Sequence, residues 1–164
     1  MNAPPIGTLN LKLVPQTIEE VRAMVEALDA AGKAELSAGW LARLYGSTPA
    51  DTWTLGFTVV HRASDMVVGK AGFKGPPGED GIVEIAYGVD KEHQGKGYAT
   101  EAAQALVAFA FASGLVRVVR AHTLPESNAS MRVLFKCGFR HVGEVNDPED
   151  GLVWRWEKQN EPAS

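Results

Sequence analysis

The sequence predicts an α+β fold in which helices pack around a mixed sheet. Three observations support this prediction: consecutive strand-like segments in the first half, helical and strand-like segments that alternate in the second, and two strand-like segments at the end. The chain has 164 residues, of which 45% are hydrophobic and 22% charged, a composition typical of one domain with a substantial core. We therefore expect a single domain over residues 1–164, with about seven strands and about four helices.

The first half of the chain predicts a strand, two helices and three strands in sequence. Apolar and polar residues alternate before Pro15, as they do in a strand, and Thr17 is a suitable cap for the helical spacing that follows. Turn residues separate the later strands, which favours a meander. The expected elements are a strand over 9–14, helices over 17–28 and 37–45, and strands over 53–61, 66–74 and 82–89.

The second half predicts two helices, each followed by a strand, and a closing hairpin. An Ala-rich helical segment begins at residue 98 or 99 and stops at Gly114. Asn128, or the serine before it, is a suitable cap for the second helix, and Gly138 stands where a helix C′ glycine is preferred. The expected elements are helices over 98–113 and 128–136 and strands over 116–121, 139–145 and 151–158.

Charge and composition argue against several classes of protein. A net charge of −4 and a pI near 5.6 argue against a protein that mainly binds nucleic acid, since phosphate backbones attract clustered Lys and Arg. The single cysteine cannot form an internal disulfide, and no apolar run approaches the roughly 20 residues of a membrane span. The N-terminus lacks the basic and apolar regions of a signal peptide. We expect a cytoplasmic protein without a membrane or nucleic-acid partner.

The most informative motif lies between the strand over 82–89 and the helix after it. It consists of Gln94, Gly95, Lys96, Gly97, Tyr98, Ala99 and Thr100. Two glycines one residue apart let the backbone approach a ligand closely, and N–H groups at a helix N-terminus bind anions. The motif therefore predicts a phosphate site, with an ordinary strand-to-helix turn as the alternative for a bare Gly-x-Gly.

Two familiar phosphate loops do not fit these residues. A P-loop needs a glycine where Asp90 stands and a serine or threonine where Gly97 stands. A dinucleotide-binding loop needs a third glycine, and Thr100 occupies its position. The P-loop is excluded and the dinucleotide-binding loop is disfavoured.

The loop matches the pattern Gln-x-x-Gly-x-Ala, and here the sequence resembles the GCN5-related N-acetyltransferases (GNAT), in particular the branch with the ribosomal-protein N-terminal acetyltransferases. Gln94, Gly97 and Ala99 match a family loop that holds the pyrophosphate of acetyl-coenzyme A. Residues 128–139 resemble the family's Asn-x-Ser…Val-Leu-x-Lys-x-Gly-Phe pattern, and residues 9–13 and 153–157 are also similar. The resemblance implies a mostly antiparallel sheet splayed at the cofactor site and acetyl-CoA as co-substrate.

The resemblance also implies which residues bind the coenzyme. The loop over 94–100 would hold the pyrophosphate, and Tyr87, Gly88 and Val89 lie where the pantetheine arm adds like a strand and a backbone N–H polarises the acetyl carbonyl. Gly88 marks either a bulge that opens the sheet or a simple bend. Asn128 either bonds the pantetheine arm or caps its helix, and Ser130 is either a first-turn residue or a hydroxyl near the thioester.

Acetyl transfer to an amine needs an oriented donor, a base and hydrogen-bond donors for the oxyanion. Glu84 is the candidate base, because it lies in an otherwise apolar strand and burial makes carboxylates better proton acceptors near neutral pH. The alternative is a solvated or lysine-paired Glu84, but relatives often carry a glutamate in this strand. Leu134 stands where many relatives have a tyrosine that protonates the thiolate, so the thiolate leaves unassisted or takes a proton from water or Ser130.

The sequence therefore predicts an N-acetyltransferase in which the amine of a protein N-terminus or small molecule attacks acetyl-CoA directly. An acetyl-CoA or CoA sensor without turnover, and a nucleotide- or RNA-binding module, remain alternatives. We expect the acceptor amine to bind near residues 33–51 and 75–81. We expect the protein to be a monomer or a homodimer. We expect no metal, because the four histidines lack ligand spacing, and a buried structural role for Cys137.

Overall fold

The computed structural model describes residues 5–34, 36, 41–42, 44, 52–125, 129–148 and 151–160. These residues form one eight-stranded sheet in the order β1-β2-β3-β4-β5-β6-β8-β7. Only the pair β5–β6 is parallel, so the predicted mixed, mostly antiparallel α+β fold is confirmed. The strands are β1 (Ile6–Gly7), β2 (Leu11–Pro15), β3 (Phe57–His61), β4 (Val67–Phe73), β5 (Ile82–Val89), β6 (Val118–Thr123), β7 (Arg140–Asp147) and β8 (Gly151–Gln159). The helices are α1 (Ile18–Ala27), α2 (Ala30–Ala34), α4 (Thr52–Leu55), α5 (Tyr98–Ala112) and α6 (Ala129–Lys136), with a 3₁₀ turn, η1 (Lys91–His93).

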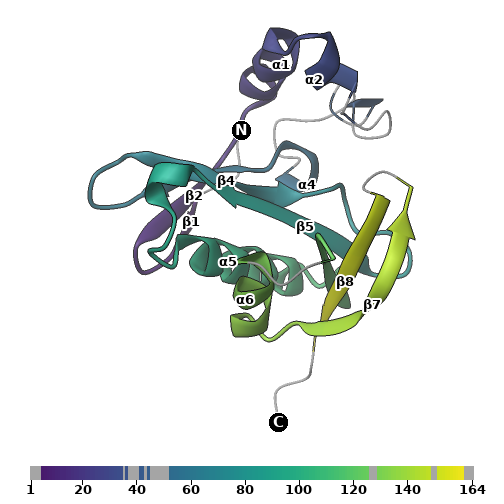
Figure 1. Cartoon of the computed structure of the whole chain (residues 1–164). Helices are drawn as coiled ribbons and strands as arrows, with labels where there is room; N and C mark the ends of the chain where they lie inside the picture. The colour runs from purple at the N-terminus through teal and green to yellow at the C-terminus, as the bar shows by residue number, and fades with distance from the viewer. Residues whose placement is uncertain are drawn as a thin grey trace.

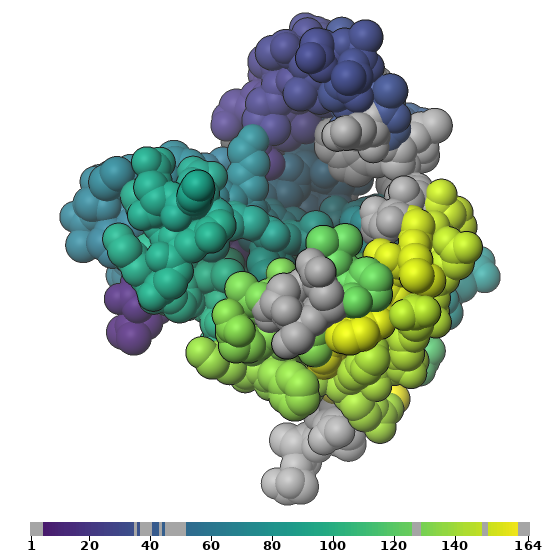
Figure 2. Space-filling model, in the orientation of Figure 1, coloured from purple at the N-terminus to yellow at the C-terminus, as the bar shows by residue number. Residues whose placement is uncertain are grey.

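The helices lie on both sides of the sheet. Figure 1 shows α5 and α6 below it and α1 and α2 above it. The apolar side of α5 packs with β2 to β6 and with Trp156 of β8 in the main core. A smaller apolar cluster joins Val21 and Val25 of α1 to Leu44 and Leu55. In Figure 2 a recess in the surface separates the α1–α2 segment from the C-terminal strands.

Several boundaries differ from the sequence prediction, and the largest error concerns residues 53–55. These residues form α4 instead of the start of a strand, because Gly56 has a φ of +71° and its N–H bonds the carbonyl of Thr52. Trp53 thereby reaches the rings of Phe73 and Phe109, with centroids 4.7 and 5.3 Å away.

The remaining differences lie at strand ends and in short elements. β1 and α2 were not expected, β2 starts two residues later than predicted, and β6 is displaced by two residues towards the C-terminus. The amides of Arg117 and Val118 both bond the carbonyl of Gly81, which sets the start of β6. The predicted helix over 37–45 lies largely outside the described residues.

The central feature for function is the separation of β5 from β6. Ile82, Val83 and Glu84 pair with Val118, Val119 and Arg120, and over the described residues this ladder ends there. Beyond it, β5 pairs only with β4, from Ile85↔Phe73 to Val89↔Gly69, while β6 continues against β8. The sheet therefore splays after Glu84, as the resemblance implies. None of the described helices has the length and apolar character needed to cross a bilayer.

Candidate functional site

The glycine loop joins the open end of β5 to α5. Gly95 and Gly97 have φ values of +79° and +82°, a conformation that side chains with a Cβ rarely adopt, and Gly97 is the N-cap of α5. The side-chain amide of Gln94 donates to the carbonyl of Val89 at 3.0 Å. The loop therefore folds back against β5 and places an uncapped helix N-terminus there, an arrangement suited to an anion.

Backbone groups on the splayed edge of β5 point into the gap that opens between β5 and β6. The amide of Asp90 donates to Val68, and the carbonyl of Glu84 accepts from Lys74, so the even-numbered residues bond towards β4. Because bonding direction alternates along a strand, the N–H groups of Tyr87 and Val89 point towards the gap between β5 and β6. An extended ligand entering the gap would meet these two donors.

A cavity of about 540 Å³ lies between β5, the glycine loop and α6. Its lining contains most of the residues predicted for the coenzyme: Tyr87, Gly88, Val89, Gln94, Gly95, Gly97, Tyr98, Ala99, Thr100 and Ser130. Lys96 is not part of this lining, and Asn128 lies outside the described residues. The structure thus gathers segments about 30 residues apart in sequence around one space.

The structure adds two cationic lining residues that the sequence did not predict, Arg132 and Lys136, and it also places at the cavity His93, for which the sequence left phosphate contact and a solvated loop position open. Arg132 and Lys136 are one helical turn apart on α6, and His93 belongs to η1. The spacing of the two α6 cations is a sequence signal that could have been found, since residues four apart share a helix face. Arg132 and Lys136 bring positive charge to the cavity.

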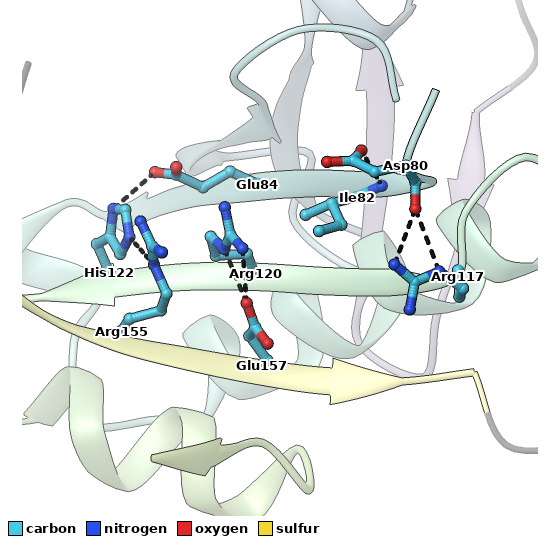
Figure 3. A network of polar contacts seen from close by, with 8 residues as sticks. All are labelled: Asp80, Ile82, Glu84, Arg117, Arg120, His122, Arg155 and Glu157. Atoms are coloured by element: carbon cyan, nitrogen blue, oxygen red, sulfur yellow. Dashed lines mark hydrogen bonds and ion pairs between the residues drawn. The ribbon is translucent and has the colours of Figure 1, made fainter. Parts of the chain in front are cut away.

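Glu84 occupies the point where β5 and β6 separate (Figure 3). Its carboxylate Oε2 lies 2.9 Å from Nζ of Lys74 and 3.4 Å from Nδ1 of His122. The expectation that apolar neighbours surround Glu84 is wrong, because Val83 and Ile85 point to the opposite face of the strand. The side chain is 18% exposed, so the lysine pairing considered from sequence occurs at a sheltered position rather than on a solvated face.

Two further cavities meet at Glu84. A small one of about 170 Å³ shares Tyr87 and Ser130 with the cavity at the glycine loop. The other, of about 390 Å³, shares Lys74 and Glu84 with the small one. Its remaining lining is Gly75, Pro76, Gly78, Asp80, Ile82, Val83, Arg120, Asp147 and Pro148. The three cavities thus form a series with Glu84 between the outer two.

Burial keeps two groups near these cavities in their neutral forms. Burial, and secondly repulsion from the Cys137 thiolate that forms at alkaline pH, raises the pKa of the Tyr87 phenol above its ordinary value. Burial also raises the pKa of the Cys137 thiol, an effect that Lys158 partly opposes. Cys137 is 4% exposed, which agrees with a structural thiol and not with a nucleophile.

Gly88 does not form the bulge proposed as one possibility. The β4–β5 register passes through Lys70↔Gly88 without a shift, and the sheet opens on the other edge of β5. The close approach belongs to Gly69, where an added Cβ would lie 2.1 Å from the carbonyl oxygen of Gly88. Within the described ranges, no group of three or more His, Cys, Asp or Glu could hold a metal ion.

Comparisons with known proteins agree with this geometry. The model of the acetyltransferase (GNAT) domain family matches residues 11–140. The uncharacterized N-acetyltransferase p20 of Bacillus licheniformis is 33% identical over 93 residues, 57% of this chain and 52% of that protein, so the match spans about half of the relative.

Solved structures share the fold over nearly the whole chain. A putative GnaT-family acetyltransferase from Bordetella pertussis has a TM-score of 0.66 at 28% identity, covering 95% of this chain and 99% of that one. RimL, a ribosomal L7/L12 alpha-N-protein acetyltransferase solved with coenzyme A, has a TM-score of 0.68 at 17% identity, with coverages of 95% and 98%.

Proposed function

Since the chain belongs to the GNAT acetyltransferase family, we propose that it transfers the acetyl group of acetyl-CoA to a primary amine. The observation that carries the proposal is the splayed sheet, with a cavity on either side of Glu84 and a smaller one that joins them. A two-substrate reaction needs such a meeting point, because the amine and the thioester must approach from separate sides.

In this proposal, the cavity at the glycine loop takes the coenzyme. The backbone N–H groups of residues 94–100 and the positive end of α5 would hold the pyrophosphate, and Arg132 and Lys136 would add charge for its phosphates. The pantetheine arm would lie in the gap between β5 and β6. The N–H of Val89 would then polarise the thioester carbonyl and later stabilise the oxyanion.

Glu84 would accept the proton of the acceptor ammonium, directly or through one water. The amine nitrogen then attacks the thioester carbon, the tetrahedral intermediate collapses, and the C–S bond breaks to release the CoA thiolate. Ser130, which lines the cavity at the glycine loop and the small cavity beside it, or a water passes the second proton of the attacking nitrogen to the thiolate. No covalent enzyme intermediate is needed.

The acceptor would enter through the cavity formed by Lys74 to Glu84, Arg120 and the end of β7. Its lining combines carboxylates with cations, and we propose a small amine or a protein N-terminus as the acceptor. The turn over 75–81, which the sequence associated with the acceptor, contributes to this lining.

A panel of amines tests the proposal. Purified protein and acetyl-CoA are mixed with N-terminal peptides, aminoglycosides, polyamines and amino acids, and free CoA thiol is measured with and without enzyme. We expect enzyme-dependent thiol release with at least one amine, together with acetylated product by mass spectrometry. Acetyl-CoA binding without release on any amine would contradict catalysis and favour a sensor. A lack of acetyl-CoA binding would overturn both.

A further inference from the structure

Glu84 is the end of a chain of polar side chains that crosses three strands (Figure 3). Arg155 of β8 donates from Nε to Nε2 of His122 on β6 over 3.1 Å. Nδ1 of His122 lies 3.4 Å from Oε2 of Glu84, a close polar contact that is not aligned as a hydrogen bond. The strand register explains the alignment, because His122 pairs with Arg155 and stands two residues beyond Arg120, the partner of Glu84. Residues two apart share one face of a strand, so the chain runs along a single face of the sheet.

The hydrogen-bond chemistry of this chain determines where the imidazole proton lies. A guanidinium only donates, and a neutral imidazole has one donor and one acceptor nitrogen. Since Nε2 of His122 accepts from Arg155, the ring proton must be on Nδ1, the nitrogen that faces the Glu84 carboxylate. In the opposite tautomer the N–H on Nε2 would point at the Nε–H of Arg155, a second donor. The unprotonated Nδ1 would then face the Glu84 carboxylate.

The other charged side chains near Glu84 do not displace His122 from the carboxylate. Lys74, the residue that follows β4, approaches the same carboxylate oxygen. Arg120, the neighbour on β6, is held by Glu157 of β8 with its Nε and a terminal nitrogen 2.9 and 2.8 Å from one carboxylate oxygen. The His122 side chain is only 5% exposed, and shielding from water strengthens polar contacts.

We propose that Arg155 and His122 are positioning residues for Glu84. Arg155 fixes the proton of His122 on Nδ1, so that the partial positive charge of this N–H faces the carboxylate 3.4 Å away and orients it. The role in turnover depends on the proposed function of Glu84 as base, whereas the imidazole tautomer does not.

The tautomer is tested without any acceptor. The full chain is labelled with ¹⁵N-histidine, and the His122 signals are identified by their loss in His122→Phe. We expect a protonated Nδ1 and an unprotonated Nε2 in the wild type, and a loss of this preference in Arg155→Met. A proton on Nε2 of His122 in the wild type would overturn the proposal.

The role in turnover is tested by the pH profile of kcat/KM with an amine found in the panel. In His122→Phe the carboxylate loses the N–H dipole that faces it, so the acid limb of the profile should move up by about one pH unit, a tenfold change. In Arg155→Met, Nε2 of His122 loses its donor and can take up a proton. The resulting positive ring would favour the ionised Glu84 carboxylate, so the acid limb of the profile should move to lower pH. Arg155→Lys keeps a cationic donor and should stay near the wild type.

His141→Phe is the matched control, since this exposed imidazole on β7 contacts only the rings of Trp154 and Trp156 among the interactions described. Its acid limb should not move. Limbs that stay in place, or move in the same direction, in His122→Phe and Arg155→Met would overturn the positioning role. Absence of acetyl transfer by the wild type would instead refute the proposed function, while the NMR result would still decide the tautomer.

Discussion

The two halves of β5 have different neighbours. The first half, from Ile82 to Glu84, is bonded to β6, whereas the second half, up to Val89, is bonded to β4 on its other edge. The strand thus changes partners at Glu84 and stays anchored along its whole length. A sheet can therefore open for a ligand without leaving an unpaired strand, because the second half of β5 stays hydrogen-bonded to β4 on its other edge.

The largest expected effect comes from the residue at the change of partners. Glu84→Gln should lower kcat at least about 100-fold, because the amide cannot accept the ammonium proton. Acetyl-CoA affinity should stay within about twofold, since the coenzyme is expected to bind along the second half of β5. Steady-state kinetics and calorimetric titration measure the two quantities. Unchanged kcat would show that Glu84 is not the base.

The edge of β5 that pairs with β4 should tolerate little added side-chain volume at Gly69. Gly69→Ala would bring a Cβ to 2.1 Å from the Gly88 carbonyl oxygen, so we expect a loss of about 3 kcal/mol in the free energy of unfolding. Gly88→Ala meets no atom within 4 Å and should cost less than about 1 kcal/mol. Urea unfolding compares the pair, and equal losses would contradict the difference.

The glycine loop beside the open half should be sensitive in binding more than in stability. Gly97→Ala forces a Cβ into a left-handed conformation, which costs about 1–2 kcal/mol. Relaxation of this strain moves the loop amides, so acetyl-CoA affinity should fall about tenfold.

Gly114→Ala is the matched control for this change. Its φ is +75° and an added Cβ meets nothing within 4 Å, as at Gly97, but it lies at the far end of α5. We expect the same stability cost with unchanged affinity in a coenzyme titration. Equal affinities in the two variants would argue against coenzyme binding at the loop.

The smallest expected effect concerns the attachment of α5 to the N-terminal strands. The Glu101 carboxylate in the first turn of α5 accepts from the Thr8 hydroxyl and from Asn10 backbone and side-chain N–H groups. Burial acts to raise the pKa of Glu101, but these hydrogen bonds outweigh it and lower the pKa. A lowered pKa in the folded state stabilises the fold above the unfolded pKa, and this stability is lost as pH falls through the folded value.

Glu101→Gln should therefore cost about 1 kcal/mol at pH 7 after allowance for solvent screening, and less near pH 3. Urea midpoints of the wild type and variant across this range measure the difference. A constant difference between the two proteins would contradict the assigned role of the carboxylate charge.

Local sequence patterns predicted most of the helices and strands. They did not predict which strands distant in the sequence lie side by side, and that pairing determines the surroundings of Glu84 and the splay of the sheet. Tyr98 to Ala112 and the closing hairpin follow from periodicity and turn residues. Residues 53–55 alternate as a strand does, and only the positive φ of Gly56 reverses that prediction. The residues around Glu84 come from β4 and β6, so the sequence near Glu84 could not show that Lys74 and His122 would face it. The splay was expected only through the family resemblance, because no residue pattern in β5 encodes where β6 departs.

The burial of Tyr87 has a consequence for spectroscopy of the protein. A phenol that ionises only above its ordinary value keeps its neutral absorption band through the alkaline range in which exposed tyrosines convert to phenolate. An ultraviolet titration should thus show a late, separate step for this ring. Ionisations seen in rate profiles below pH 10 then belong to other groups.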